Sequence, residues 1–482
     1  MNSRRLALLA AASLLLAGCA IGPNYKRPAA LPSKAPTPAA FKEAEGWTQA
    51  EPADAVSRQD WWKVFNDPVL DDLEAQVVVS NQTLAQSEAA YRQGRAVLDQ
   101  QRAALFPTVT GGGSGVQSQS PSGFTGAQGS LAPSARPIDI YSTSIGLTWD
   151  VDVWGRIRRA IESAHATAQA DAADLATATL AAQVLLAADY FQLREADEEK
   201  RLIDQTAKGY ADNLRIAQIQ TKAGTGPLSA ELQAQVQLQS AQASAEDEVR
   251  TRQQFEHAIA VLVGKAPADL TIAAAGWNPA VPAVPVSMPS TLLQRRPDIA
   301  AAERRMKAAN ALIGVNEAGY FPDVQVNGSY GFTSTVLKQL LNARNNIWSV
   351  QGSAVETLFN AGATGAKVRG ARASYDAAVA NYRQTVLTAF SQVEDNIAAL
   401  RVLGSEYDLD VAASQEADRV EDLINKQYQV GTIDYTTVVV NQQAALAARR
   451  AVLQTARARL VAMVNLVGDF GGGWSDTQLA QK

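Results

Sequence analysis

The sequence predicts an α+β membrane protein in which amphipathic β-strands lead into very long α-helices. Residues 141–151, YSTSIGLTWDV, alternate apolar and polar side chains with the period of two that is typical of a strand with one apolar face. Residues 156–222 follow without a proline and are rich in Ala, Leu, Gln and Glu, which favour helix. A helix of this length would extend about 100 Å, far more than a compact domain needs. The same combination returns later in the chain.

The N-terminus has the pattern of an exported lipoprotein precursor. Two arginines precede an apolar run that is too short to span a bilayer, so we interpret residues 1–18 as a signal peptide. The run ends in Leu-Ala-Gly-Cys, which resembles a bacterial lipobox, and we expect Cys19 to carry a covalent lipid. The alternative is a chance cysteine beside an ordinary signal peptide. Ala20 replaces the Asp that would favour retention in the inner membrane, so the outer membrane is favoured.

Composition argues against several other classes of protein. Without the two arginines of the signal peptide, the chain has 41 basic and 48 acidic residues, a balance that gives no indication of a nucleic-acid partner. A single cysteine excludes internal disulfides and cysteine-based metal sites. The only histidines, His165 and His257, lie in predicted helices without metal-ligand spacing, and the sequence has no phosphate-binding loop or nucleophile elbow. We therefore expect neither an enzyme nor a metal site, and no cofactor besides the lipid.

The chain reaches its first helix through a proline-rich lead. Residues 19–66 are predicted to be an extended segment that follows the lipid anchor. Asp67 then precedes Pro68, a combination typical of a helix start, and we expect this helix to run to about Leu105. The Trp pair at 61–62, just before the helix, is interpreted as core packing.

The first structural unit is predicted to span residues 67–265. After the first helix, a Gly-rich strand, TVTGGGSGVQ, and a polar loop lead to the strand at 141. The long helix ends at a turn around Gly224 and Thr225, and a shorter helix runs from 229 to 263 before a glycine. A proline-rich linker, residues 266–290, follows.

The second unit, residues 291–468, repeats this order and precedes a tail, 469–482. It offers a helix from about 297 to 318, strands near 323–333 and 346–354, a long helix from about 365 to 430 and a last helix from 435 to 467. An internal duplication is indicated because landmarks recur in the same order. The matched pairs are Leu105-Phe106-Pro107 with Tyr320-Phe321-Pro322, Gly224-Thr225 with Gly431-Thr432, and Val263-Gly264 with Val467-Gly468.

The four strands indicate a β-barrel that several chains share. Strands of about ten residues suit a tilted crossing of the bilayer. Four strands cannot close a barrel, and open sheet edges are not tolerated in lipid. At least two chains must therefore combine. Aromatic residues near the strand ends are expected at the membrane interfaces, although each one singly could be a core residue: Trp149, Trp154, Phe321 and Trp348.

The long helices have a narrow, Ala-rich apolar stripe and polar side chains elsewhere. Small residues at spacings of three and four allow close, coiled-coil-like packing. The remaining polar surface cannot be buried, so the pattern favours a hollow helical cylinder with a water-filled lumen. A filamentous coiled coil is the alternative, but it would not need strands or a lipid anchor.

Several segments together resemble a known family over nearly the whole mature chain. They are CAIGPNYKRP at 19–28, WWKVFNDPVLDDL at 61–73, LLQRRPDIAAAERRMKAANALIGVNEAGYFP at 292–322, YDAAVANYRQTVLTAFSQVEDNIAAL at 375–400 and the terminal LVGDFGGGW. The sequence is similar to the TolC-like outer-membrane efflux factors, in particular their NodT-type lipoprotein branch. One departure is the last strand-to-helix corner, Phe-Asn-Ala-Gly-Ala at 359–363, where the family often has a second Gly.

The resemblance implies a homotrimer with a 12-stranded barrel in the outer membrane of a Gram-negative bacterium. It further implies a 12-helix periplasmic tunnel with an equatorial belt built from the N-terminal lead, the linker and the C-terminal segment. The partners would be a periplasmic adaptor and an inner-membrane, proton-driven pump of the resistance–nodulation–division class. The chain would then be a passive exit duct for small toxic compounds. The alternative is a duct of a type I protein or polysaccharide secretion system.

The closed periplasmic end of such a duct is expected at the two helix–helix turns. Approaching the second turn, Asp418, Asp422 and Asn425 fall on one helix face. Our hypothesis is that these side chains form a cation-sensitive gate, and the alternative is a solvated outer face. The turn residues are Gly224, Thr225, Gly431 and Thr432, and the basic residues expected to hold the carboxylates of neighbours are Arg419 and Lys426.

Overall fold

The computed structural model describes residues 20–31, 40–43, 60–119, 137–277, 280–282 and 295–472. The predicted signal peptide, Cys19 and most of the C-terminal tail lie outside these residues. The chain divides into two compact units. We call the first the strand unit (Met1–Pro28, Arg92–Ala170, Glu303–Asn381) and the second the helical unit (Ala29–Tyr91, Asp171–Ala302, Tyr382–Lys482).

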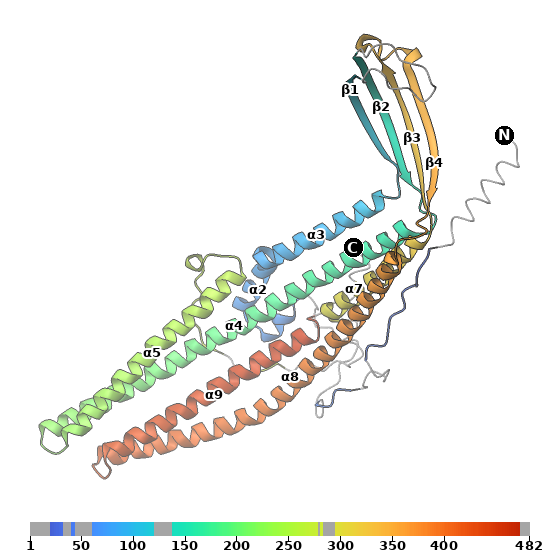
Figure 1. The fold of residues 1–482 in the computed structure, drawn as a ribbon. Helices are drawn as coiled ribbons and strands as arrows, with labels where there is room; N and C mark the ends of the chain where they lie inside the picture. The colour runs from blue at the N-terminus through green and yellow to red at the C-terminus, as the bar shows by residue number, and fades with distance from the viewer. Residues whose placement is uncertain are drawn as a thin grey trace. The chain divides into compact units, whose positions relative to one another are not determined.

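The strand unit contains one antiparallel sheet with the strand order β1-β2-β3-β4 (Figure 1). Ile145 lies opposite Tyr330, and Tyr330 lies opposite Trp348, so the predicted apolar residues of three strands share one face. All three side chains are exposed. The sheet therefore presents an uncovered apolar surface on a single chain. The strands are β1 (Thr108–Ser118), β2 (Ile138–Asp150), β3 (Asp323–Ser334) and β4 (Asn346–Val355).

The opposite face of the sheet is polar. Gln325 donates to Asp150 across the β2–β3 pair at 3.0 Å, and Asn327 donates to Gln325 at 3.0 Å. Hydroxyl pairs such as Ser329 with Ser349 connect β3 to β4. The alternation seen in the sequence is thus confirmed as one apolar and one polar face.

Two pairs of helices have matching lengths. The helices α4 (Arg156–Lys222) and α8 (Ala363–Gln429) each have 67 residues, and α5 (Leu228–Leu262) and α9 (Tyr435–Asp469) each have 35. Figure 1 shows α5 returning along α4, and α9 along α8. The predicted bounds of the first long helix are confirmed, and those of the second differ by two residues at its start and one at its end. A further helix, α7 (Pro297–Glu317), precedes β3.

The predicted helix from Pro68 to about Leu105 is wrong in one respect, because it is two helices. α2 (Pro68–Ser80) ends at Asn81, and α3 (Gln82–Ala103) begins directly after it. The side-chain oxygen of Asn81 accepts from the backbone N–H groups of Thr83 and Leu84, and its nitrogen donates to the Leu262 carbonyl at 2.7 Å. An N-cap of this kind satisfies the free donors of the new helix.

The main core of the helical unit lies around the Trp pair. Trp61 and Trp62 are 4% and 5% exposed, and their rings meet edge to face with centroids 5.9 Å apart. They pack in one cluster with residues of α2, α4, α5 and α9, among them Leu70, Tyr190 and Leu460. The interpretation of the pair as core packing is confirmed.

Candidate functional site

The two helix–helix turns have the same geometry. Gly224 and Gly431 adopt φ values of 72° and 77°, which glycine reaches without a Cβ clash. The N–H of Thr225 donates to the Gln220 carbonyl at 2.9 Å, and the N–H of Thr432 donates to Gln427 at 3.0 Å. Both threonine hydroxyls donate to the same carbonyls. Each turn therefore satisfies the last carbonyls of a long helix with a glycine-based cap.

A small aromatic core joins the two hairpins beside these turns. Tyr428 and Tyr435 are each 4% exposed, with ring centroids 5.4 Å apart. The Tyr428 hydroxyl and the Gln220 side-chain oxygen lie 3.1 Å apart, in a hydrogen bond between α8 and α4. Burial raises the pKa of Tyr435 to about 12, so its ring stays neutral. This contact was not predicted from the sequence, although two tyrosines on either side of a glycine turn are a local signal for it.

The carboxylates predicted on one face of α8 are partly bound by a basic residue of another helix. Arg449 of α9 donates to Asp418 at 2.7 Å and to Glu421 at 2.6 Å. Burial lowers the pKa of Arg449, but Glu421 and Asp418 together raise it above its ordinary value. The partner of Asp418 is therefore a residue of the next helix that the sequence analysis did not select.

The other predicted gate residues have partners nearby. Asp422 is paired with Lys426 one turn further along α8. Arg419 binds Glu416 at 2.7 Å, and the Asn425 amide oxygen accepts from Gln442 at 3.3 Å. Arg419 and Lys426 thus bind acidic residues of their own helix within one chain. The role of these residues in a gate stays a prediction.

Helix α9 is the basic element that connects the long helices. It has four arginines and no acidic residue between Tyr435 and Gly468. Besides Arg449, Arg450 binds Glu199 of α4 at 2.8 Å, and Arg457 lies 3.5 Å from Glu195. Burial raises the pKa of Glu195 to about 7, although Arg457 lowers it. This one-sided charge was visible in the sequence and indicates partners on other helices.

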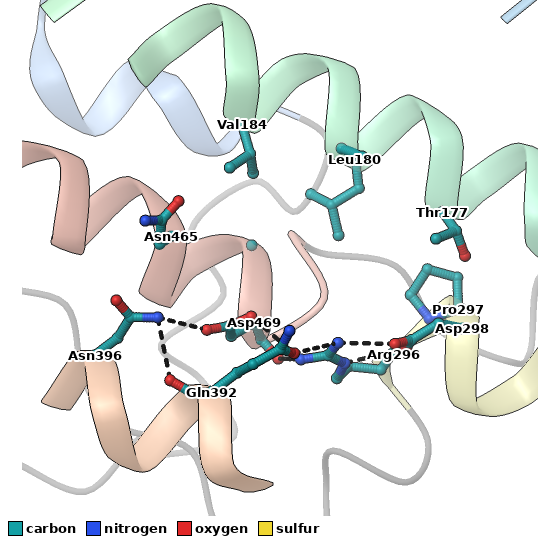
Figure 2. Close-up of a pocket in the computed structure, with 12 residues that line it drawn as sticks. Thr177, Leu180, Val184, Arg296, Pro297, Asp298, Gln392, Asn396, Asn465 and Asp469 are labelled. Carbon is teal, nitrogen blue, oxygen red and sulfur yellow. Dashed lines mark hydrogen bonds and ion pairs between the residues drawn. The ribbon is translucent and has the colours of Figure 1, made fainter. Parts of the chain in front are cut away.

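The Arg-Arg-Pro-Asp motif forms a network at the start of α7 (Figure 2). Arg296 donates to Asp298 at 2.7 and 3.0 Å, to the Asp469 carboxylate at 3.2 Å and to Gln392 at 2.9 Å. Asn396 donates to the other Asp469 oxygen at 2.7 Å. Burial raises the pKa of Asp469, while Arg296 lowers it. The network joins the ends of α7 and α9 to the side of α8, beside a cavity of about 340 Å³ that Leu180 and Val184 also line.

The four aromatic residues predicted at the membrane interfaces fall into two groups. Trp154 donates to the Pro322 carbonyl at 2.8 Å, and its ring lies 5.0 Å from that of Phe321. Trp149 donates to the Leu105 carbonyl at 3.0 Å. Trp348, in contrast, is 71% exposed on β4. The first three residues support the strand ends, and their contact with lipid stays a prediction.

The strand-to-helix corner that departs from the resembled family is strained. Ala361 has a φ of 52° and Gly362 a φ of 87°. The left-handed region costs a residue with a Cβ roughly 1–2 kcal/mol. The alanine therefore occupies a position that suits the second glycine.

No residue set for a metal is apparent in the part of the chain that the structure describes: no group of three His, Cys, Asp or Glu lies within binding distance of one ion. An exposed apolar sheet with open edges, together with paired helices of 67 and 35 residues, defines the class of outer-membrane channel proteins. The family model of the outer membrane efflux proteins matches residues 74–265 and 288–472. The chain belongs to this family.

Relatives and solved structures agree over nearly the full length. The probable efflux pump outer membrane protein TtgC of Pseudomonas putida is 29% identical, with 98% of this chain and 96% of the relative covered. The pyoverdine export outer membrane protein OpmQ of Pseudomonas aeruginosa is 29% identical, with 100% of both covered. The outer-membrane channel OprN has a TM-score of 0.86 at 28% identity, covering 95% of this chain and 100% of that one. The Campylobacter jejuni CmeC channel, at 21% identity, shows the same fold with a TM-score of 0.88, covering 95% and 96%. The chain is an efflux component of the outer membrane.

Proposed function

We propose that three copies of this chain form the exit duct of a tripartite efflux pump. The observation that carries the proposal is the open sheet, in which β1 and β4 are the two edges of four strands with an exposed apolar face. Such a sheet is stable in lipid only when both edges are paired. Three copies would close a barrel of 12 strands, within the range of known outer-membrane barrels.

The helices would continue this barrel as a periplasmic tunnel. Among the described residues, α4, α5, α8 and α9 form two sets with the same two lengths, which supports both a 12-helix tunnel and an internal duplication. We place the two repeats at 67–265 and 291–468. The lead at 19–66, the linker at 266–290 and the tail at 469–482 would contribute to an equatorial belt around them.

The duct would be passive and would depend on partners for energy. We propose a periplasmic adaptor and an inner-membrane pump driven by protons, and no chemical reaction within the duct. The names of the relatives, which include toluene, antibiotic and pyoverdine export, support small molecules as cargo. The lipid on Cys19 would add a second attachment to the outer membrane.

The turns at Gly224 and Gly431 would form the closed periplasmic end. Asp418 and Asp422 remain our candidates for a constriction, with Arg449 and Lys426 as the groups that neutralise them in the resting state. The side chains of Asp418 and Asp422 are partly exposed, which supports access of dissolved cations to them.

The oligomeric state tests the proposal directly. Native mass spectrometry of the detergent-purified protein is expected to give three chains per particle. A monomer would contradict the shared barrel, and a dimer would contradict the barrel of three copies. A parallel reconstitution distinguishes the cargo: export of a dye with an adaptor and a proton-driven pump supports efflux, whereas export of a polypeptide with an ATPase partner would favour the secretion alternative.

A further inference from the structure

The segment that follows Cys19 is bound closely to the strand unit. We call residues 20–25 the strap. At its start, the Ile21 N–H donates to the Trp154 carbonyl at 3.0 Å. Ala20 lies against Gly155, where a Cβ would come within 2.7 Å of the Ala20 Cα. Because Gly155 also has a φ of 82°, only glycine suits this position between β2 and α4.

Arg159 of α4 binds the strap from one side. Its Nε donates to the Ile21 carbonyl at 3.1 Å, and its Nη2 donates to the Gly22 carbonyl at 3.1 Å and to the Asn24 side-chain oxygen at 2.9 Å. Glu162 accepts from Nη1 at 2.7 Å and orients the guanidinium. Arg159 is only 5% exposed. The planar guanidinium reaches four acceptors at once, three of them in the strap, which the single ammonium of lysine cannot do in the same geometry.

Helix α7 binds the strap from the other side. Asn310 donates to the Pro23 carbonyl at 2.8 Å, and the Tyr25 hydroxyl donates to Glu303 at 2.8 Å. Gly22 has a φ of 98°, and a Cβ there would lie 2.4 Å from the Gly314 Cα. The N-terminal motif CAIGPNYKRP and the α7 motif containing Glu303, Asn310 and Gly314 are therefore two halves of one contact.

This contact limits how far a lipid on Cys19 can move relative to the strand unit. Nine free residues, 20–28, would let the lipid move by about 30 Å, because an extended chain spans about 3.3–3.6 Å per residue. That distance equals the thickness of the hydrocarbon core, about 30 Å. With Ala20 seated on Gly155, the lipid-carrying position is the residue directly before the bound chain.

We propose that the strap is a positioning device that fixes the lipid of Cys19 beside the junction of β2 and α4, with Arg159 as its positioning residue. The strap thereby sets the depth of the sheet in the membrane. This inference rests on the proposed lipidation of Cys19, and the experiment separates the two.

The test compares Arg159→Lys and Gly22→Ala with Arg158→Lys as the matched control. Arg158 is the neighbouring residue of α4 and binds Asp152 and the Val153 carbonyl, not the strap. Each protein is purified from cells labelled with palmitate, reconstituted in liposomes and treated with trypsin, which cleaves after Lys26 when the strap is released. We expect both strap variants to keep their label and to be cleaved at least about tenfold faster than the wild type, because they lose several hydrogen bonds or gain a backbone clash. The control should be cleaved at the wild-type rate.

A second readout measures the depth of the sheet. Cys19 is the only natural cysteine, and its sulfur is blocked when it carries the lipid, so Val350→Cys on β4 gives a unique site for a spin label. Electron paramagnetic resonance should show a wider distribution of label depth in the strap variants than in the control. If the strap variants are labelled normally with palmitate and show the cleavage rate and label depth of the control, the positioning role of the strap is overturned and the lipidation of Cys19 is not. Absence of a lipid on the wild-type protein would overturn the lipidation and, with it, the positioning role.

Discussion

A buried carboxyl group on α2 makes the stability of the helical unit depend on pH. Glu74 is 0% exposed, and neither of its carboxyl oxygens has a hydrogen-bond partner among the described residues. Burial and, to a smaller extent, the nearby charge of Asp71 together raise its pKa to about 9. The group is therefore neutral in the folded protein at pH 7, but ionised in the unfolded chain, where its ordinary pKa is 4.5.

The sign and size of the effect follow from proton linkage. Between pH 4.5 and about 9 the folded state keeps a proton that the unfolded state releases, so stability is full below pH 4.5 and falls as the pH rises. At 1.36 kcal/mol per pH unit, the loss amounts to about 3 kcal/mol at pH 7. Glu74→Gln has a neutral side chain of the same shape at every pH, so it should lack this loss.

Thermal denaturation of the detergent-purified protein at pH 5, 7 and 9 checks this prediction. The melting temperatures of the wild type and Glu74→Gln should be similar at pH 5 and should separate at pH 7 and 9, with the variant more stable. Reading the difference between the two proteins removes the contribution of other titrating groups, such as Glu195. The same pH dependence in both proteins would show that Glu74 does not titrate as its burial requires.

Three further changes test other parts of the structure. Ala361→Gly should raise the free energy of unfolding by about 1 kcal/mol by removing left-handed strain, and an unchanged or lower melting temperature would contradict this account of the corner. Arg449→Gln leaves the partly buried Glu421 without its cation, so it should lower the free energy of unfolding by about 1–2 kcal/mol. The same variant should increase single-channel conductance in planar bilayers, and a conductance equal to that of the wild type would show that Arg449 is not part of the gate. Arg296→Lys loses the forked guanidinium that binds Asp298 and Asp469, so it should lower the free energy of unfolding by about 2 kcal/mol. In denaturation experiments its effect should not add to that of Asp469→Asn, and simple additivity would show that Arg296 and Asp469 are not coupled.

The parts of the fold that local patterns encode were predictable. The bounds of α4 follow from a proline-free run between Gly155 and the glycine turn at 224. The two-residue period of β2 and β3 fixes their apolar face, because register preserves parity across a sheet. Each of these signals lies within a few residues of the feature that it predicts.

The parts that depend on distant residues were not predictable. At the break, the Asn81 side chain donates to the Leu262 carbonyl, 181 residues away, and nothing in the sequence next to Asn81 indicates that partner. The pairing of Asp418 with Arg449 was missed because the two residues lie 31 positions apart on different helices, and no local spacing connects them. The strap motif was noticed as a pattern, but its purpose appears only when the side chain of Arg159 is placed against it.

Transport in cells tests the central claim most directly. A strain without its own outer-membrane channel, but with a periplasmic adaptor and a proton-driven inner-membrane pump, can be loaded with a fluorescent efflux substrate and followed after energisation. We predict that the wild-type chain restores rapid loss of the dye and that this loss stops when the proton gradient is collapsed. If the chain reaches the outer membrane as a trimer and the dye is still retained, it is not the exit duct of an efflux pump.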